Sequence, residues 1–137
     1  MDNKICLDSD IIIEILKNNL ELKNKLETIS KQGDIFCTTS INVFETWFGR
    51  ENNEIFLNFL EGLYSISFDE DSAKKAAVIL NVLKKEGSRI EARDLFIAAI
   101  CITNNLELLT NNKKHFERLK KLGLKLVDKT ISNIKGK

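Results

Sequence analysis

The chain has 137 residues, of which 43% are hydrophobic and 30% are charged, and its formal net charge is +1. These values indicate one globular domain with a sizeable core, and they exclude a strong overall field that would attract nucleic acid. No apolar run approaches the roughly 20 residues that span a bilayer, and Asp8, Asp10 and Glu14 interrupt the N-terminal apolar run that a signal peptide would need. We therefore expect a cytoplasmic protein without membrane association.

Apolar runs and helical periodicities alternate along the chain. Short apolar runs predict strands at 4–7, 34–38, 64–68, 107–109 and 124–127. Apolar residues at helical spacing predict helices at 8–18, 21–30, 40–49, 54–63, 69–86, 94–104 and 113–122. Because the strands are joined by long connections without hairpin signals, we expect one α/β domain at 4–128. It should have a central, mostly parallel sheet of four to five short strands with helices on both faces, followed by a polar tail at 129–137.

Three acidic residues interrupt apolar surroundings at widely separated positions. Asp8 ends the apolar strand predicted at 4–7, and Glu45 interrupts an apolar helical stripe that begins at Ile41. Asp94 stands in the first turn of a helix that is otherwise almost wholly apolar. A carboxylate that enters a dry core is costly unless something pairs with it. Together the three acids suggest that they share one cation.

Each of these acids also has an ordinary structural explanation. Asp8 can cap the helix that follows it, and Asp94 can complement the helix dipole from its place in the first turn. Glu45 can lie at an exposed edge or form a salt bridge with Arg50 or Arg93. The hypothesis that the three acids share a cation fails only if all three explanations hold at once.

The predicted topology brings several polar residues to one edge of the sheet. Ligands of parallel α/β sheets bind at the carboxyl ends of the strands. Asp8 follows the first predicted strand, Ser40 follows the second, and Thr110 and Asn112 follow the fourth. Clustered carboxylates suit hard cations such as Mg²⁺ and Mn²⁺, which can activate water and offset charge on a phosphate. The acids are thus a plausible centre for phosphodiester hydrolysis.

Four sequence segments carry a resemblance to a known family. They are ICLDSDI at 5–11, SINVFE at 40–45, IEARDLFIAA at 90–99 and LLTNNKKHF at 108–116. With these segments in this order, the chain resembles the PIN-domain nucleases, most closely the VapC toxins of type II toxin–antitoxin pairs. The resemblance extends from about Ile5 to Val127 and so covers nearly the whole chain.

The resemblance implies a metal-dependent endoribonuclease that hydrolyses RNA phosphodiester bonds and is neutralised by a cognate, VapB-like antitoxin. It places Asp8, Glu45 and Asp94 as ligands of Mg²⁺ or Mn²⁺, and it also implies a homodimer. A fourth acid of the family falls here on Asn112, which remains a catalytic candidate that could hold a water or a phosphate oxygen. This departure puts a second metal in doubt. Asp10 could supply the missing charge or only cap its helix.

Two further groups of residues are candidates for binding surfaces. Polar or basic side chains close to the four segments are candidates for RNA contact: Ser40, Arg89, Arg93, Thr110 and Lys113. Aromatic residues gather between positions 44 and 59, and packing of a helix pair in the core explains most of them. Their excess suggests a groove for a partner helix, formed by Phe44, Trp47 and Phe48.

Two rival functions stay open. The chain could be a catalytically weak PIN-like module that binds RNA or protein, although the intact acidic trio argues against it. It could also be a haloacid-dehalogenase-like phosphatase with Asp8 as the nucleophile, because LDSD at 7–10 fits the DxD pattern of that family. That family also needs a paired acid after a later strand, where this chain has Asn111 and Asn112.

Overall fold

The computed structural model describes residues 3–17, 20–30 and 33–127. Within these ranges the strands form one five-stranded sheet in the order β3-β2-β1-β4-β5, and every neighbouring pair is parallel. The strands are β1 (Lys4–Leu7), β2 (Ile35–Thr39), β3 (Tyr64–Ile66), β4 (Glu107–Leu109) and β5 (Lys125–Leu126). The predicted α/β architecture is confirmed, with edge strands shorter than expected. The tail predicted at 129–137 lies outside the described residues.

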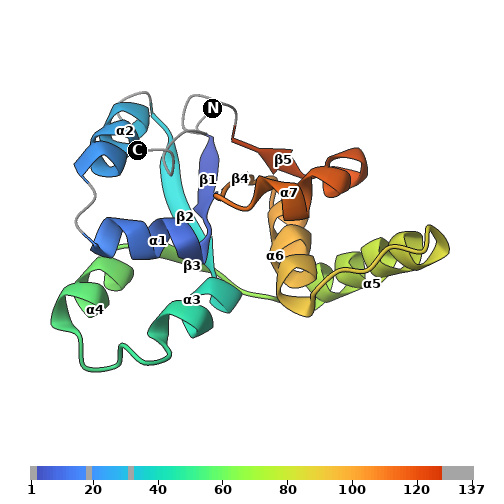
Figure 1. The fold of residues 1–137 in the computed structure, drawn as a ribbon, viewed down its shortest axis with the longest axis horizontal. Helices are drawn as coiled ribbons and strands as arrows, with labels where there is room; N and C mark the ends of the chain where they lie inside the picture. The colour runs from blue at the N-terminus through green and yellow to red at the C-terminus, as the bar shows by residue number, and fades with distance from the viewer. Residues whose placement is uncertain (1–2, 18–19, 31–32, 128–137) are drawn as a thin grey trace.

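Helices cover both faces of this sheet (Figure 1). They are α1 (Ser9–Leu16), α2 (Leu20–Ser30), α3 (Ser40–Trp47), α4 (Glu54–Glu61), α5 (Glu70–Lys85), α6 (Ala92–Thr103) and α7 (Lys113–Phe116), with a 3-10 helix, η1 (Glu117–Leu122). Strand β1 divides the core, because its successive side chains point to opposite faces. Ile5 and Leu7 pack with α1 and α2, whereas Cys6 packs with α5 and α6. The central strand is thus buried on both sides, and its carboxyl end is held rigidly.

The segment after β4 differs from the prediction in its helix type. The single helix predicted at 113–122 is one turn of α-helix, α7, followed by η1. Phe116 and Leu119 are nonetheless fully buried. Gly123 ends η1 in the left-handed region, with φ of 113°, which an L side chain rarely adopts.

Helix α3 turns two polar side chains, and not its phenylalanines, toward the interior. Its buried side chains are Asn42 and Thr46, whereas Phe44 and Phe48 are 70% and 73% exposed. Phe44 and Phe48, which belong to the apolar stripe that Glu45 interrupts, therefore do not face the core, whereas Ile41 at the start of the stripe is half-buried against it. The physical reason is that α3 starts at the end of β2 and packs beside the polar N-terminus of α1, where a polar helix face finds hydrogen-bond partners.

No helix in the described part of the chain is long and apolar enough to cross a membrane.

Candidate functional site

Asp8 lies at the centre of the carboxyl edge of the sheet, between the last residue of β1 and the first of α1. Its carboxylate is buried and accepts hydrogen bonds from three elements. Ser9 N and Asn42 Nδ2 donate to Oδ1 at 2.7 and 3.0 Å, and Thr110 Oγ1 donates to Oδ2 at 2.7 Å. The capping role proposed from the sequence is present, because Asp8 is the N-cap residue of α1. Asp8 is thus held in one orientation.

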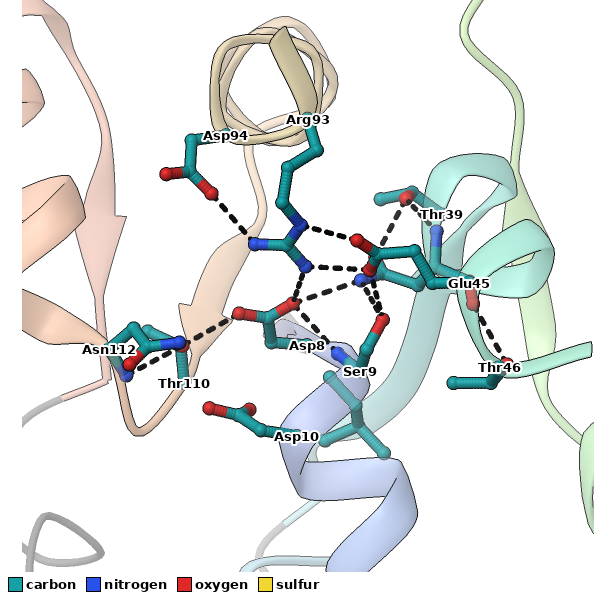
Figure 2. Close-up of polar contacts among 12 residues, drawn as sticks. Asp8, Ser9, Asp10, Thr39, Glu45, Thr46, Arg93, Asp94, Thr110 and Asn112 are labelled. Atoms are coloured by element: carbon teal, nitrogen blue, oxygen red, sulfur yellow. Dashed lines mark hydrogen bonds and ion pairs between the residues drawn. The ribbon is translucent and has the colours of Figure 1, made fainter. Parts of the chain in front are cut away.

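The structure brings Glu45 and Asp94 beside Asp8, and the guanidinium group of Arg93 lies among the three carboxylates (Figure 2). Arg93 Nε and Nη2 bind the two carboxylate oxygens of Glu45 at 2.6 and 2.7 Å. Nη2 also lies 2.8 Å from Asp8 Oδ1, and Nη1 lies 2.7 Å from Asp94 Oδ1. The salt bridge between Glu45 and Arg93, which is one of the explanations that the sequence offers for Glu45, is present. It is one part of a network in which Arg93 contacts three acids.

The charges of this cluster shift the pKa values of its members. Burial raises the pKa of Glu45, but hydrogen bonds from Arg93 and Ser9 outweigh burial and hold the pKa below its usual value. Burial lowers the pKa of Arg93, but the hydrogen bonds that Arg93 donates to Glu45 and the charge of Asp8 raise the pKa by more, so the guanidinium stays protonated. Glu45 and Arg93 therefore form an ionised pair.

Asp10 is a fourth acid at this edge. Its Oδ2 accepts a hydrogen bond of 3.0 Å from Asn111 N, while its Oδ1 is buried and has no hydrogen-bond partner. Burial and the nearby charge of Asp8 raise the pKa of Asp10 to about 6. An unpartnered buried carboxylate oxygen beside other acids marks a place where a cation or a water would be stabilising.

An open cleft with a volume of about 570 Å³ leads to the acids. Its lining includes the predicted catalytic residues, with aromatic rings at one side: Asp8, Ser9, Asp10, Ile13, Phe44, Glu45, Phe48, Glu91, Arg93, Asp94, Asn112 and His115. Asn112 is exposed, and its backbone N donates to Thr110 Oγ1 at 3.0 Å. His115 Nδ1 lies 3.5 Å from Asp94 Oδ2 and is also exposed.

The candidate RNA-binding residues fall in different places. Thr110 and Arg93 belong to the acidic cluster itself. Arg89 lines a neighbouring cleft that also includes Asp94, and Lys113 opens α7 directly after Asn112. Ser40 does not join the cluster, because its hydroxyl accepts a hydrogen bond from Phe68 N at 3.2 Å.

Three polar residues that were not predicted as site residues also belong to the cluster: Ser9, Thr39 and Asn42. Asn42 Nδ2 donates to Ser9 Oγ at 2.9 Å as well as to Asp8, and Ser9 Oγ donates to Glu45 Oε1 at 2.5 Å. Thr39 Oγ1 donates to Asn42 Oδ1 at 2.7 Å and so fixes the orientation of the amide. The available signal was the pair Asn42 and Thr46, which lie one turn apart on a single polar face of α3.

The aromatic groove beside the cleft is exposed. Ser40, Val43, Phe44, Trp47, Phe48 and Glu51 line it. The rings of Phe44 and Phe48 have centroids 6.4 Å apart, and Trp47 packs edge-on against buried Phe56 at 6.0 Å. The interpretation that core packing explains most of these aromatics is wrong for Phe44 and Phe48. Exposed apolar surface of this kind is typical of an interaction site.

The acidic cluster fits a hard divalent cation in its chemistry, although Arg93 stands in its centre. Among the described residues, no group of three or more His, Cys, Asp or Glu side chains is spaced to hold a metal ion as it stands. The donor atoms of Asp8, Glu45 and Asp94 are nevertheless all carboxylate oxygens, which Mg²⁺ and Mn²⁺ prefer. Three carboxylates around one guanidinium also leave an excess of negative charge. The residues therefore fit such an ion if Arg93 withdraws.

Comparison with known proteins identifies the family of this chain. Residues 5–122 match the family model of the PIN domain. The curated relatives include "Ribonuclease VapC1" of Methanocaldococcus jannaschii, which is 35% identical over 129 residues that cover 93% of this chain and 90% of that protein. "Ribonuclease VapC2" of Haemophilus influenzae is 30% identical over 124 residues, which cover 85% of this chain and 92% of that protein.

Solved structures with the same fold include two VapBC structures. VapBC2 from Rickettsia felis, bound to a DNA fragment from their promoter, has a TM-score of 0.78 and 29% identity, covering 91% of this chain and 99% of that chain. VapBC-1 from nontypeable Haemophilus influenzae has a TM-score of 0.73 and 29% identity, covering 93% of this chain and 98% of that chain. The chain belongs to the PIN-domain family. Its relatives within that family are VapC ribonucleases, which favours the PIN interpretation over the phosphatase alternative.

Proposed function

We propose that this chain is an endoribonuclease that depends on Mg²⁺ or Mn²⁺ and hydrolyses RNA phosphodiester bonds at Asp8, Glu45 and Asp94. The observation that carries the proposal is the convergence of these three carboxylates, from three separate elements, on one point at the edge of an open cleft. Relatives named ribonucleases, which share at least 30% of their residues with this chain, support the same reaction class.

The three acids differ in access to the cleft, and this difference suggests separate roles. The side chains of Asp8 and Asp94 are 1% and 5% exposed, so these two acids are suited to be ligands of the ion. The side chain of Glu45 is 29% exposed and therefore more accessible from the cleft. Glu45 is the acid that can reach an attacking water and accept its proton at Oε2. A divalent ion bound there would lower the pKa of a coordinated water and would stabilise the negative charge on the phosphate. Asn112, at the cleft wall, can orient a phosphate oxygen or a water.

Basic side chains beside the acids support RNA as the substrate class. The cleft next to Asp94 is lined by Arg89, Lys114, His115 and Arg118. These groups can neutralise phosphates on either side of the scissile bond, whereas the chain as a whole carries almost no net charge. Positive charge is thus concentrated where an RNA backbone would approach the acids.

We also propose that a VapB-like antitoxin binds in the aromatic groove. Phe44 and Phe48 line both this groove and the catalytic cleft. A helix that buries these two rings would therefore also reach the entrance to the acids, so binding and inhibition would be coupled. VapBC structures among the structural relatives support a partner of this class. The homodimer implied by the family resemblance stays a prediction.

The decisive experiment uses the purified full chain, free of antitoxin, with RNA and Mn²⁺ or Mg²⁺. We expect cleavage that stops in EDTA and that falls by roughly 100-fold or more in Asp94→Asn, because the variant removes a charge from the reacting centre. Asp71→Asn is the matched control, since Asp71 also lies in the first turn of a helix but is exposed and outside the lining of the cleft. Cleavage that persists in EDTA and in Asp94→Asn contradicts the proposal. Retention of RNA without any cleavage supports the binding-module alternative instead.

A further inference from the structure

Arg93 uses its three guanidinium nitrogens to bind the three acids. Nε and Nη2 contact Glu45, Nη2 also contacts Asp8, and Nη1 contacts Asp94, all at 2.6–2.8 Å. The side chain is 26% exposed, so the contact is partly shielded from water and lies at the cleft wall. A planar guanidinium with donors on three sides matches carboxylates in a way that a point charge cannot. Arg93 is thus the cation that the cluster holds.

The position of Arg93 depends mainly on acids from outside its own helix. Arg93 is in the first turn of α6, where the helix dipole places partial positive charge and disfavours a cation. Two of its three partners come from outside α6: Asp8 from the end of β1, and Glu45 from α3. Loss of these contacts would leave Arg93 at the mouth of an open cleft, where its long side chain can turn into solvent.

The acids, in contrast, have supports that do not involve Arg93. Asp8 keeps its hydrogen bonds from Ser9 N, Asn42 and Thr110. Glu45 keeps the hydrogen bond from the Ser9 hydroxyl. The carboxylates of Asp8 and Glu45 would therefore stay near their present positions if the guanidinium left, while Asp94 would keep, among the described residues, only the contact of 3.5 Å between its Oδ2 and His115 Nδ1.

A divalent ion and the guanidinium compete for these oxygens. Mg²⁺ binds carboxylate oxygens at about 2.0–2.1 Å. Asp8 Oδ1 and Asp94 Oδ1 each already hold a guanidinium nitrogen, at 2.8 and 2.7 Å. An ion on those two atoms would lie within a few ångströms of the positive guanidinium, where repulsion in a partly buried site is strong.

We propose that Arg93 is an internal gate on the metal site: it neutralises Asp8, Glu45 and Asp94 in the metal-free protein and must withdraw before a divalent ion can bind. The inference rests on the proposed metal-dependent function and adds its regulation. Metal binding and the Arg93 contacts exclude each other, so each weakens the other by the same free energy. Arg93 thereby lowers metal affinity while it stabilises the metal-free fold, so the nuclease needs a higher concentration of free divalent ion to become active than it would without Arg93.

The test measures Mn²⁺ binding to the EDTA-treated full chain by isothermal titration calorimetry, so that the result does not depend on catalysis. Arg93→Gln should bind Mn²⁺ roughly tenfold or more tightly than the wild type, because the competing cation is gone. Arg93→Lys keeps the charge but lacks the planar fork, and it should bind with intermediate affinity. Arg89→Gln removes a charge from the neighbouring cleft without an acid contact in the cluster, and it should change affinity by no more than about threefold.

A second measurement covers the case in which a variant is unstable. Thermal unfolding without metal should show a lower midpoint for Arg93→Gln, because three carboxylates lose their partner, and a larger rise on Mn²⁺ addition than for the wild type. If Arg93→Gln folds only when Mn²⁺ is added, the inference is supported. Arg93→Lys, which keeps a cation in place, then supplies the affinity comparison.

Two results overturn the inference, and they have different consequences for the proposed function. If the wild type binds Mn²⁺ while Arg93→Gln and Arg93→Lys bind it equally or more weakly, Arg93 positions the ligands and does not gate them, and the metal-dependent nuclease stands. If neither the wild type nor the variants bind Mn²⁺, both the gate and the metal-dependent function fall.

Discussion

Asn42 Nδ2 donates a hydrogen bond of 3.0 Å to Asp8 Oδ1 and so joins the buried face of α3 to the end of β1. The amide has little choice of orientation, because its Oδ1 accepts from Thr39 Oγ1 at 2.7 Å. Its Nδ2 also reaches Ser9 Oγ at 2.9 Å. A fully buried amide whose two ends are fixed in this way orients the carboxylate that it contacts. Asn42 is therefore a positioning residue for Asp8.

Removal of the Asn42 amide should cost both stability and activity. In Asn42→Ala, Asp8, Ser9 and Thr39 each lose a buried partner, so the free energy of unfolding should fall by about 1–3 kcal/mol. RNA cleavage per folded molecule should fall as well, because Asp8 is less well fixed. Urea unfolding and single-turnover cleavage measure the two effects. Asn58→Ala on the exposed side of α4 is the control and should stay within about 0.5 kcal/mol of the wild type. Unchanged stability in Asn42→Ala would contradict the role.

Asp10 makes the stability of the metal-free protein depend on pH. Its folded pKa of about 6 lies above its unfolded value, so the folded state binds the proton more tightly. The stabilising contribution is therefore fully present below about pH 4 and is lost as the pH rises through about 6. At pH 8, Asp10→Asn should raise the free energy of unfolding in EDTA by about 1–2 kcal/mol, a figure that allows for partial solvent screening.

Urea unfolding at pH 4 and pH 8 tests this expectation. The difference between Asp10→Asn and the wild type should be small at pH 4, where the Asp10 carboxyl is neutral, and full at pH 8. Asp71→Asn on the exposed first turn of α5 controls for a change of net charge. An equal difference at both pH values would show that titration of Asp10 is not its cause.

The sheet and the meeting of the acids follow from local sequence patterns. Short apolar runs separated by helical periodicities predict parallel strands, and the carboxyl ends of parallel strands share one edge. That geometry places Asp8 and Thr110 together, as the structure shows with a hydrogen bond of 2.7 Å. Ser40 illustrates the limit of such an argument. Thr39 is the last residue of β2 and donates to Asn42 at the edge, whereas Ser40 is the first residue of α3 and its hydroxyl accepts a hydrogen bond from Phe68 N instead.

The placement of Arg93 and the orientation of α3 depend on tertiary geometry. Arg93 contacts Glu45 across 48 residues and Asp8 across 85 residues, and no periodicity encodes which of several acids a flexible side chain meets. The helical spacing of Phe44 and Phe48 shows that they share a face but not whether that face is buried. The polar partners at the end of β1 decide the orientation, because they bind Asn42.

Phe48 should contribute to antitoxin binding and little to folding. Its ring is 73% exposed in the groove next to the cleft, so Phe48→Glu should change the free energy of unfolding by no more than about 0.5 kcal/mol. Affinity for a cognate VapB-like antitoxin should fall by roughly tenfold or more, because a charge would be buried at an aromatic contact. Ile55→Glu is a matched control, since Ile55 is 75% exposed on α4 and outside the groove lining. Equal affinities for Phe48→Glu and the wild type would exclude the groove as the antitoxin site.

A substitution at Thr110 can separate what one buried hydroxyl contributes to stability from what it contributes to function. Its Oγ1 donates to Asp8 Oδ2 and accepts from Asn112 N, so Thr110→Val removes both hydrogen bonds with little change in shape. Thr38 is a close control, because it is also buried but donates at 2.9 Å to Leu7 O, a backbone atom outside the acidic cluster.

Both Thr→Val variants should lose about 1–3 kcal/mol of unfolding free energy, because each leaves a buried polar group unpaired. Only Thr110→Val should also weaken Mn²⁺ binding and RNA cleavage, since only Thr110 orients a carboxylate of the proposed metal site. Calorimetric Mn²⁺ titration and single-turnover cleavage, measured on both variants at equal folded fraction, make the comparison. If the two variants lose affinity and activity equally, the effect of Thr110 is a general loss of rigidity, and Asp8 does not need its hydroxyl.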